Sequence, residues 1–335
     1  MQARVHDQER SGGVLLTGAT GFVGMELLAR FLERTDRPVY ALVRGRDDRE
    51  VAARVRDTLL SLFGPDHPHG DRVVGVRGDI TRPGLGLNGA GRWLAEEVTE
   101  IIHGAASVSF ELDLESARAI NVSGTRRVLE FAERARERGG LRRLSYISTA
   151  YVAGEHCGRF SEDDLDVGQR FRNAYEQSKF EAERLMASWR KRLPVTVLRP
   201  SIIVGELVEL ATAFFERPAP RLIEPRLYRR VVHPLLVRAS SDERRRRALK
   251  RSEAFFPYFD TRVVYDDRRA RVALRADAIS PTPLRQYFDR LAEFALQADW
   301  GRRPIPRASL AQSAAARRRA AARPRAARTR TEVYA

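Results

Sequence analysis

Tyr175 and Lys179 have the residue types and the spacing that acid–base chemistry needs. Only three of the 60 basic residues are lysines, and Lys179 follows Tyr175 by four positions. Residues i and i+4 share one face of a helix, so the ammonium can lie beneath the phenol and lower its pKa. The spacing alone is compatible with chance. It indicates a tyrosine that donates a proton if a cofactor motif accompanies it.

A glycine-rich segment near the N-terminus provides that motif. The apolar run Val14–Leu16 predicts a buried strand, and the apolar pattern of residues 22–34 predicts a helix. Gly18 and Gly21 lie between the two elements, and Gly24 lies near the start of the helix. Gly18 permits the tight turn, Gly21 lets the backbone approach a pyrophosphate, and Gly24 allows close packing of the helix. An ordinary turn is the alternative, but a strand before and a helix after favour a dinucleotide site.

The second predicted strand, Val39–Val43, bears on the choice of nucleotide. A chain that binds NAD usually carries an acidic residue at the end of this strand, to hold the ribose hydroxyls. Here the residue is Arg44. A guanidinium pairs well with a 2′-phosphate, so NADP is favoured over NAD. The alternative is one more surface arginine in an arginine-rich chain.

Apolar strands and helical patterns alternate through the first 200 residues. This alternation predicts an α/β fold with a doubly wound, Rossmann-type parallel sheet. Beyond Pro200 the pattern becomes mostly helical, which predicts a nucleotide-binding domain over 1–205, a small substrate region over 206–306 and a basic Ala/Arg-rich tail over 307–335. The predicted strands are Val14–Thr17, Val39–Val43, Val73–Val76, Ile101–His103, Leu144–Ser148 and Val195–Leu198, and the helices are near 22–34, 49–63, 116–138, 172–192 and 283–298.

Polar and small residues follow several of these strands. The carboxyl ends of parallel strands meet at one edge of the sheet, where ligands bind. Asp79 can accept a hydrogen bond from an adenine amino group, the small Ala105 and Ala106 let a cofactor pass over the backbone, and Ser148 and Thr149 supply hydroxyls. Because all these residues are expected at the same edge of the sheet, they predict a single ligand-binding site.

Composition excludes several classes of protein. The single cysteine, Cys157, excludes a disulfide within the chain, and no apolar stretch reaches the roughly 20 residues of a membrane span. No residues show metal-ligand spacing. Residues 301–335 carry ten arginines and one acidic residue, so they hold +9 of the net charge of +16. Because this charge lies in a tail without interleaved aromatic residues, specific nucleic-acid binding is not expected. The single cysteine fits a reducing compartment, so a cytoplasmic location is expected.

The motifs together resemble an extended short-chain dehydrogenase/reductase. Within that superfamily the chain is most similar to the male sterility protein-like branch, which contains the fatty acyl-CoA reductases and the thioester-reductase domains of peptide synthetases. The segments that carry the resemblance are Thr17–Gly24, Val39–Arg44, Gly78–Ile80, His103–Phe110, Asn121–Thr125, Ser148–Val152, Tyr175–Lys179 and Arg199–Gly205.

The resemblance implies a role for each matching residue. Tyr175 would donate the proton, Lys179 would hold the nicotinamide ribose, supported by Asn121, and Thr149 would bind the substrate oxygen, with Ser148 as the second candidate for that role. The substrate would be the thioester of an acyl-CoA or an acyl carrier protein, and the product an aldehyde or an alcohol. The residues expected to bind NADP are Gly18, Thr20, Gly21, Phe22, Val23, Gly24, Arg44, Asp79, Ile80, Ala105, Ala106, Tyr175, Lys179, Pro200 and Ile202.

The sequence departs from the family pattern after Gly205. A further strand and much of the substrate pocket normally follow there, whereas here the chain continues directly into Glu206–Leu210, which resembles a later helix. Three hypotheses stay open: a thioester reductase, an extended-family epimerase, dehydratase or hydroxysteroid-type dehydrogenase, and an NADP-binding protein without turnover. Contact of the basic C-terminal region with an anionic membrane, and a homodimer, also stay open.

Overall fold

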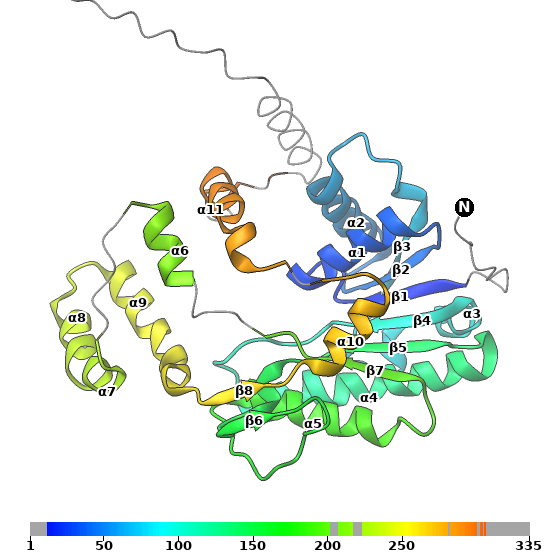
Figure 1. Cartoon of the computed structure of the whole chain (residues 1–335). Coiled ribbons are helices and arrows are strands. Elements are labelled where there is room, and N and C mark those ends of the chain that lie inside the picture. The colour runs from blue at the N-terminus through cyan, green and yellow to red at the C-terminus, as the bar shows by residue number, and fades with distance from the viewer. Residues whose placement is uncertain are drawn as a thin grey trace, which may run out of the picture.

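A six-stranded parallel sheet forms the centre of the molecule in the computed structural model, which describes residues 12–201, 207–216, 223–280, 282–299, 302–303 and 305. The strand order is β3-β2-β1-β4-β5-β7, the doubly wound order that the sequence predicts (Figure 1). The strands are β1 (Gly13–Thr17), β2 (Val39–Val43), β3 (Val73–Arg77), β4 (Val98–His103), β5 (Arg143–Ile147) and β7 (Val195–Leu198).

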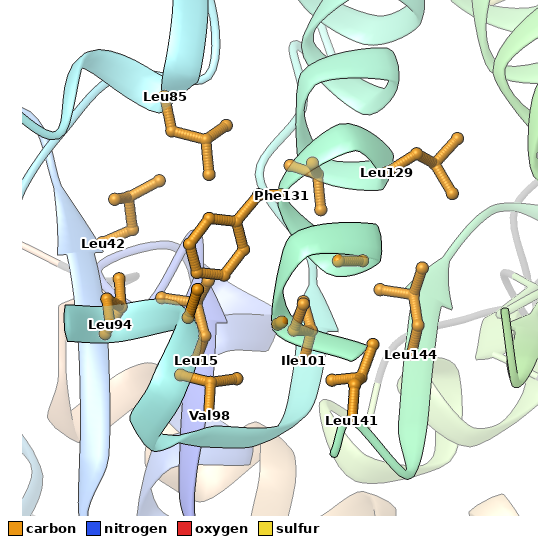
Figure 2. Packing of buried hydrophobic residues seen from close by; sticks show 14 of the residues in the cluster. Leu15, Leu42, Leu85, Leu94, Val98, Ile101, Leu129, Phe131, Leu141 and Leu144 are labelled. Carbon is orange, nitrogen blue, oxygen red and sulfur yellow. The ribbon is translucent and has the colours of Figure 1, made fainter. Parts of the chain in front are cut away.

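Helices cover both faces of this sheet. Helices α1 (Phe22–Arg34) and α2 (Asp48–Phe63) pack on one face, and α3 (Ala90–Glu97), α4 (Leu114–Gly139) and α5 (Ala174–Ser188) on the other. Successive strand residues point to opposite faces, so Leu15 packs beneath α4 while its neighbours Val14 and Leu16 pack under α1. Figure 2 shows Phe131 of α4 in the cluster with Leu15.

Several element boundaries differ from the sequence prediction. Strand β4 begins at Val98, three residues earlier than predicted, and α5 is shorter at both ends than 172–192. The start of α5 is set by Asn173, whose side chain accepts a hydrogen bond of 3.0 Å from the backbone N–H of Glu176. An asparagine that caps a helix in this way ends the helical conformation on its N-terminal side. The cap therefore fixes Tyr175 in the first turn of α5.

The described chain beyond β7 is mostly helical, as predicted, but it contains strand β8 (Val263–Tyr265), which the sequence did not predict. Strand β8 pairs in parallel with a second unpredicted strand, β6 (Gly158–Phe160), which precedes β7, in a separate two-stranded sheet. Phe160 packs there with Val263 and Tyr265. The helices of this region are α6 (Leu207–Phe214), α7 (Pro225–Leu227), α8 (His233–Ala239), α9 (Glu243–Ser252), the 3-10 helix η5 (Glu253–Asp260), α10 (Arg268–Ala276) and α11 (Phe288–Gln297).

Across the residues described, no helix combines the length and the apolar character needed to cross a membrane. The break after Gly205 and the tail over 307–335 lie outside the described residues, so the predicted division into three regions remains a prediction.

Candidate active site

A cavity of about 440 Å³ lies at the carboxyl edge of the sheet, beside the glycine turn. Parallel strands deliver their ligand-binding residues to this edge. Eight of the residues predicted to bind the cofactor line the cavity, namely Gly18, Thr20, Gly21, Arg44, Asp79, Ile80, Ala105 and Ala106. Tyr175, Lys179 and Pro200 belong to the neighbouring strand ends and to α5, and Ile202 lies outside the described residues.

The glycine turn depends on two close approaches of backbone. Gly18 has a φ of 80°, and a Cβ atom on it would lie 2.8 Å from the backbone nitrogen of Ala105. A Cβ atom on Gly24 would lie 1.9 Å from the carbonyl oxygen of Gly18. Gly24 thus holds α1 against the turn, the role predicted for it. Phe22 is 95% exposed at the start of α1, so a cofactor contact there would use its backbone N–H.

Two arginines meet at the end of β2. Arg44 lines the cavity, and so does Arg54 of α2, whose Nη1 donates a hydrogen bond of 2.7 Å to the carbonyl oxygen of Arg44. Asp79 also lines the cavity, but its Oδ1 already accepts hydrogen bonds of 2.8 Å from the backbone N–H and the hydroxyl of Thr81. The cavity therefore offers two guanidinium groups and a partly engaged carboxylate.

Tyr175 and Thr149 meet at the carboxyl end of β5. Their side chains are hydrogen-bonded, and Thr149 is buried. Burial raises the pKa of Tyr175, and the Thr149 hydrogen bond opposes that shift. The sequence predicted a lowered pKa, driven by Lys179. That prediction is wrong for this structure, because the Lys179 ammonium donates to Tyr146 Oη at 2.7 Å and to the Ile147 carbonyl at 2.8 Å.

Lys179 ends a buried chain of polar side chains that crosses the sheet. Tyr146 is hydrogen-bonded to Thr125, whose Oγ1 lies 3.1 Å from His103 Nε2. His103 Nδ1 lies 2.8 Å from Thr17 Oγ1, at the end of β1. Burial and the charge of Lys179 lower the pKa of His103 to about 3, so the imidazole is neutral. The chain thus joins the ammonium to the strand that precedes the glycine turn.

Burial also acts on Lys179 itself. It lowers the pKa of the ammonium to about 7, while the nearby Glu183 carboxylate acts in the opposite direction. Glu183 is 2% exposed, accepts a hydrogen bond of 2.5 Å from Ser148 Oγ, and forms an ion pair with Arg199 at 2.5 Å. Ser148 is therefore committed to Glu183, which leaves Thr149 as the hydroxyl that faces Tyr175.

Asn121 connects the cavity to α5. Its Oδ1 accepts from the backbone N–H of Ser107, which lines the cavity, at 2.8 Å. Its Nδ2 donates to Ser178 Oγ at 2.9 Å. Asn121 thus bonds to Ser178, next to Lys179 in the sequence, and the predicted support of Lys179 by Asn121 stays a prediction.

Aromatic rings surround the outer side of Tyr175. Its ring lies 5.5 Å from that of Phe110, and Phe110 lies 5.6 Å from Phe255 and 5.5 Å from Tyr258 of η5. Tyr151 in turn contacts Tyr258 at 4.8 Å. The Tyr175 ring thus packs against a cluster of aromatic side chains. Among the described residues, no group of three or more His, Cys, Asp or Glu side chains is placed to hold a metal ion.

Residues 16–223 match the sequence pattern of a family described as male sterility protein, an NAD-binding family, and this match covers more than half of the chain. The chain belongs to the male sterility protein family. The match extends past Gly205 and confirms the resemblance drawn from the motifs. The family is one of NAD(P)-dependent reductases.

Individual relatives agree with this assignment. The chain is similar to a linear gramicidin synthase protein of Brevibacillus parabrevis, with 32% identity over 60% of this chain and 4% of the relative. It is similar to the fatty acyl-CoA reductase wat of Drosophila melanogaster, with 28% identity over 61% of this chain and 45% of the relative. The chain thus spans less than half of either relative.

A solved structure supports the fold. The terminal R domain of the myxalamid PKS-NRPS pathway aligns with a TM-score of 0.52 at 34% identity, over 69% of this chain and 56% of that one.

Three functional side chains were missed by the sequence predictions. Glu183 stands four residues after Lys179, so the helical spacing that singled out Tyr175 also identifies it. Tyr146 stands two residues before Ser148, and alternate residues of a strand share a face, so it also had a signal. Arg54 had none, because its contact with Arg44 depends on how α2 packs.

Proposed function

We propose that this protein is an NADPH-dependent reductase of acyl thioesters, such as an acyl-CoA or an acyl group on a carrier protein. The observation that carries the proposal is the hydrogen bond between Tyr175 and Thr149 beside the nucleotide cavity, with the Lys179 ammonium held nearby by Tyr146 and the Ile147 carbonyl. Membership of the male sterility protein family supports the same reaction type.

The residues divide the work of the reaction. NADPH supplies a hydride to the thioester carbon when it is bound. Thr149 donates a hydrogen bond to the carbonyl oxygen, where negative charge develops, and Tyr175 gives that oxygen a proton. Lys179 holds its positive charge close to the same centre. The resulting hemithioacetal loses its thiol to give an aldehyde, and a second reduction at the same centre would give an alcohol.

The lining of the cavity supports a phosphorylated dinucleotide as the cofactor. Gly18 and Gly21 of the glycine turn line the cavity, so their backbone can approach a pyrophosphate there, and a side chain at Gly18 would meet the Ala105 backbone. Arg44 and Arg54 together favour a 2′-phosphate over bare ribose hydroxyls. The Arg44→Gln variant is expected to weaken NADPH binding about tenfold and to leave NADH binding unchanged. Arg46→Gln is the matched control, because the exposed Arg46 pairs with Glu50 at 2.9 Å.

The decisive test mixes the full chain with NADPH and a long-chain acyl-CoA and follows both NADPH absorbance and the product. We expect aldehyde or alcohol to form, and Tyr175→Phe to lower kcat by about 100-fold or more with little change in the Kd for NADPH. Tyr287→Phe, in the remote cluster around α11, is the control. NADPH binding without turnover of any thioester would contradict the proposal and favour a protein that only binds NADP. Turnover of a nucleotide sugar alone would favour the epimerase hypothesis.

A further inference from the structure

A second hollow, of about 360 Å³, is lined by several arginines. Three separate parts of the chain form it: the loop after Thr149, the segment before α5, and the helices beyond β7. Its charged lining consists of Arg170, Arg172, Arg226, Arg229, Arg262 and Glu155, with His156 beside them.

The positive charge of this hollow is only partly neutralised. Arg170 pairs with Glu155 at 3.0 Å, and Arg172 pairs with the buried Glu176 at 3.3 Å. Two further guanidinium groups of the lining, those of Arg226 and Arg262, belong to residues exposed to solvent. Planar guanidinium groups match pairs of phosphate oxygens better than any other side chain. The hollow therefore has the chemistry of a phosphate site.

Helix η5 contacts both this hollow and the aromatic rings around Tyr175. Pro257 lines the hollow, and its carbonyl oxygen accepts a hydrogen bond of 3.3 Å from Arg172 Nε. The next residue, Tyr258, stacks on Phe110, which contacts Tyr175. Arg172 of the hollow also lies over the Tyr258 ring, 5.3 Å from its centroid, so η5 joins the arginines of the hollow to the aromatic rings around Tyr175.

We propose that this hollow binds the phosphate of the pantetheine arm that carries the acyl thioester. The inference rests on the proposed function, because that reaction places the thioester at Tyr175. A phosphopantetheine substrate has a reactive thioester at one end and a phosphate at the other, and η5 contributes Pro257 to the hollow and Tyr258 to the aromatic rings near Tyr175. The same phosphate occurs in coenzyme A and on acyl carrier proteins.

Equilibrium binding tests the site without catalysis. The probes are S-methyl 4′-phosphopantetheine and S-methyl pantetheine, titrated calorimetrically into the full chain saturated with NADPH, so that the nucleotide cavity cannot take the phosphate. We expect the phosphorylated probe to bind about tenfold more tightly. The Arg226→Gln/Arg262→Gln variant should abolish that difference. The control, Arg230→Gln/Arg251→Gln, removes the same charge from exposed positions outside the hollow and should keep it.

The single cysteine of the chain locates the binding. Cys157 is exposed and lines the hollow, so a bound ligand should shield it. We expect the phosphorylated probe to slow alkylation of Cys157 by iodoacetamide, followed by mass spectrometry, and the unphosphorylated probe to have no such effect. Equal affinities for the two probes, or unchanged alkylation at saturation, would overturn the inference. So would a tenfold preference that persists in Arg226→Gln/Arg262→Gln.

A further probe, S-methyl coenzyme A, separates the two sources of the phosphate. Affinity equal to that of the short probe supports a carrier-bound substrate, tighter binding supports coenzyme A, and weaker binding counts against the site. None of the probes has a thioester carbonyl. A chain that binds them as expected but reduces no thioester keeps the phosphate site and loses only the proposed reaction. A chain that reduces thioesters without preferring the phosphorylated probe loses only the site.

Discussion

Helices α5 and α9 differ in where their charged side chains lie: α5 buries several of them, whereas α9 exposes them to solvent. On α5 the charged residues Glu176, Lys179 and Glu183 are each buried and bonded to other parts of the chain. On α9 no residue is buried, and Glu243 forms exposed pairs with Arg246 and Arg247. When a buried charge loses its partner, no water can solvate it, whereas water readily solvates an exposed charge. The comparison predicts that the two helices differ sharply in their tolerance of substitution.

The largest effect is expected at the glycine turn between β1 and α1, in the half of the molecule that contains the six-stranded sheet. In Gly24→Ala the new Cβ atom would meet the Gly18 carbonyl oxygen, which is backbone and cannot rotate away. We expect a loss of about 3 kcal/mol or more in the free energy of unfolding, measured with urea, and weaker NADPH binding. Gly91→Ala is the control, because its nearest neighbours lie at 3.7 Å. Equal stability of the two variants would contradict the packing role of Gly24.

The second effect separates two glutamates of α5. Glu183→Gln removes the charge that pairs with Arg199 in the interior, and the free energy of unfolding should fall by about 3 kcal/mol. Glu181→Gln, two residues away, removes a more exposed pair with Arg118 and should cost about 1 kcal/mol or less. Urea unfolding of both variants measures the contrast. If they lose the same stability, burial is not what distinguishes them.

The third effect concerns pH. The pKa of Lys179 is lowered to about 7 in the folded chain, from an ordinary value of 10.5. Between these values the unfolded chain binds more protons, so the contribution of Lys179 to the free energy of unfolding rises with pH. Relative to Lys179→Met, the wild type should gain up to about 1.4 kcal/mol per pH unit from pH 7 to pH 9, by urea unfolding. Exposed Lys250, on α9, is the control, and Lys250→Met should leave the profile unchanged.

The smallest effect is expected on α9. Glu243→Gln removes two ion pairs whose members are all largely exposed. The free energy of unfolding should change by at most about 0.5 kcal/mol, and salt should reduce the change further. A loss comparable to that of Glu183→Gln would show that α9 is held by its charges, and the comparison between the helices would fail.

The sequence predicts the half with the six-stranded sheet well, because local patterns determine its elements. The six strands, the glycine turn and the Tyr175–Lys179 spacing all follow from periodicity within a few residues. The contact of Lys179 with Tyr146 does not, since Tyr146 becomes its neighbour only when β5 and α5 pack together. The second sheet escaped prediction for a related reason: strands β6 and β8 span three residues each and pair across a long stretch of chain.

That pairing has a consequence for biosynthesis. Phe160 of β6 pairs with Tyr265 of β8, roughly 100 residues later in the chain. At a synthesis rate of about 5–20 residues per second, β8 emerges from the ribosome about 5–20 seconds after β6. During this interval the nucleotide half can fold, while Phe160 and its apolar neighbours still lack Val263 and Tyr265. The two-stranded sheet is therefore expected to form late, and in a nascent chain this apolar edge is the natural place for a chaperone to bind.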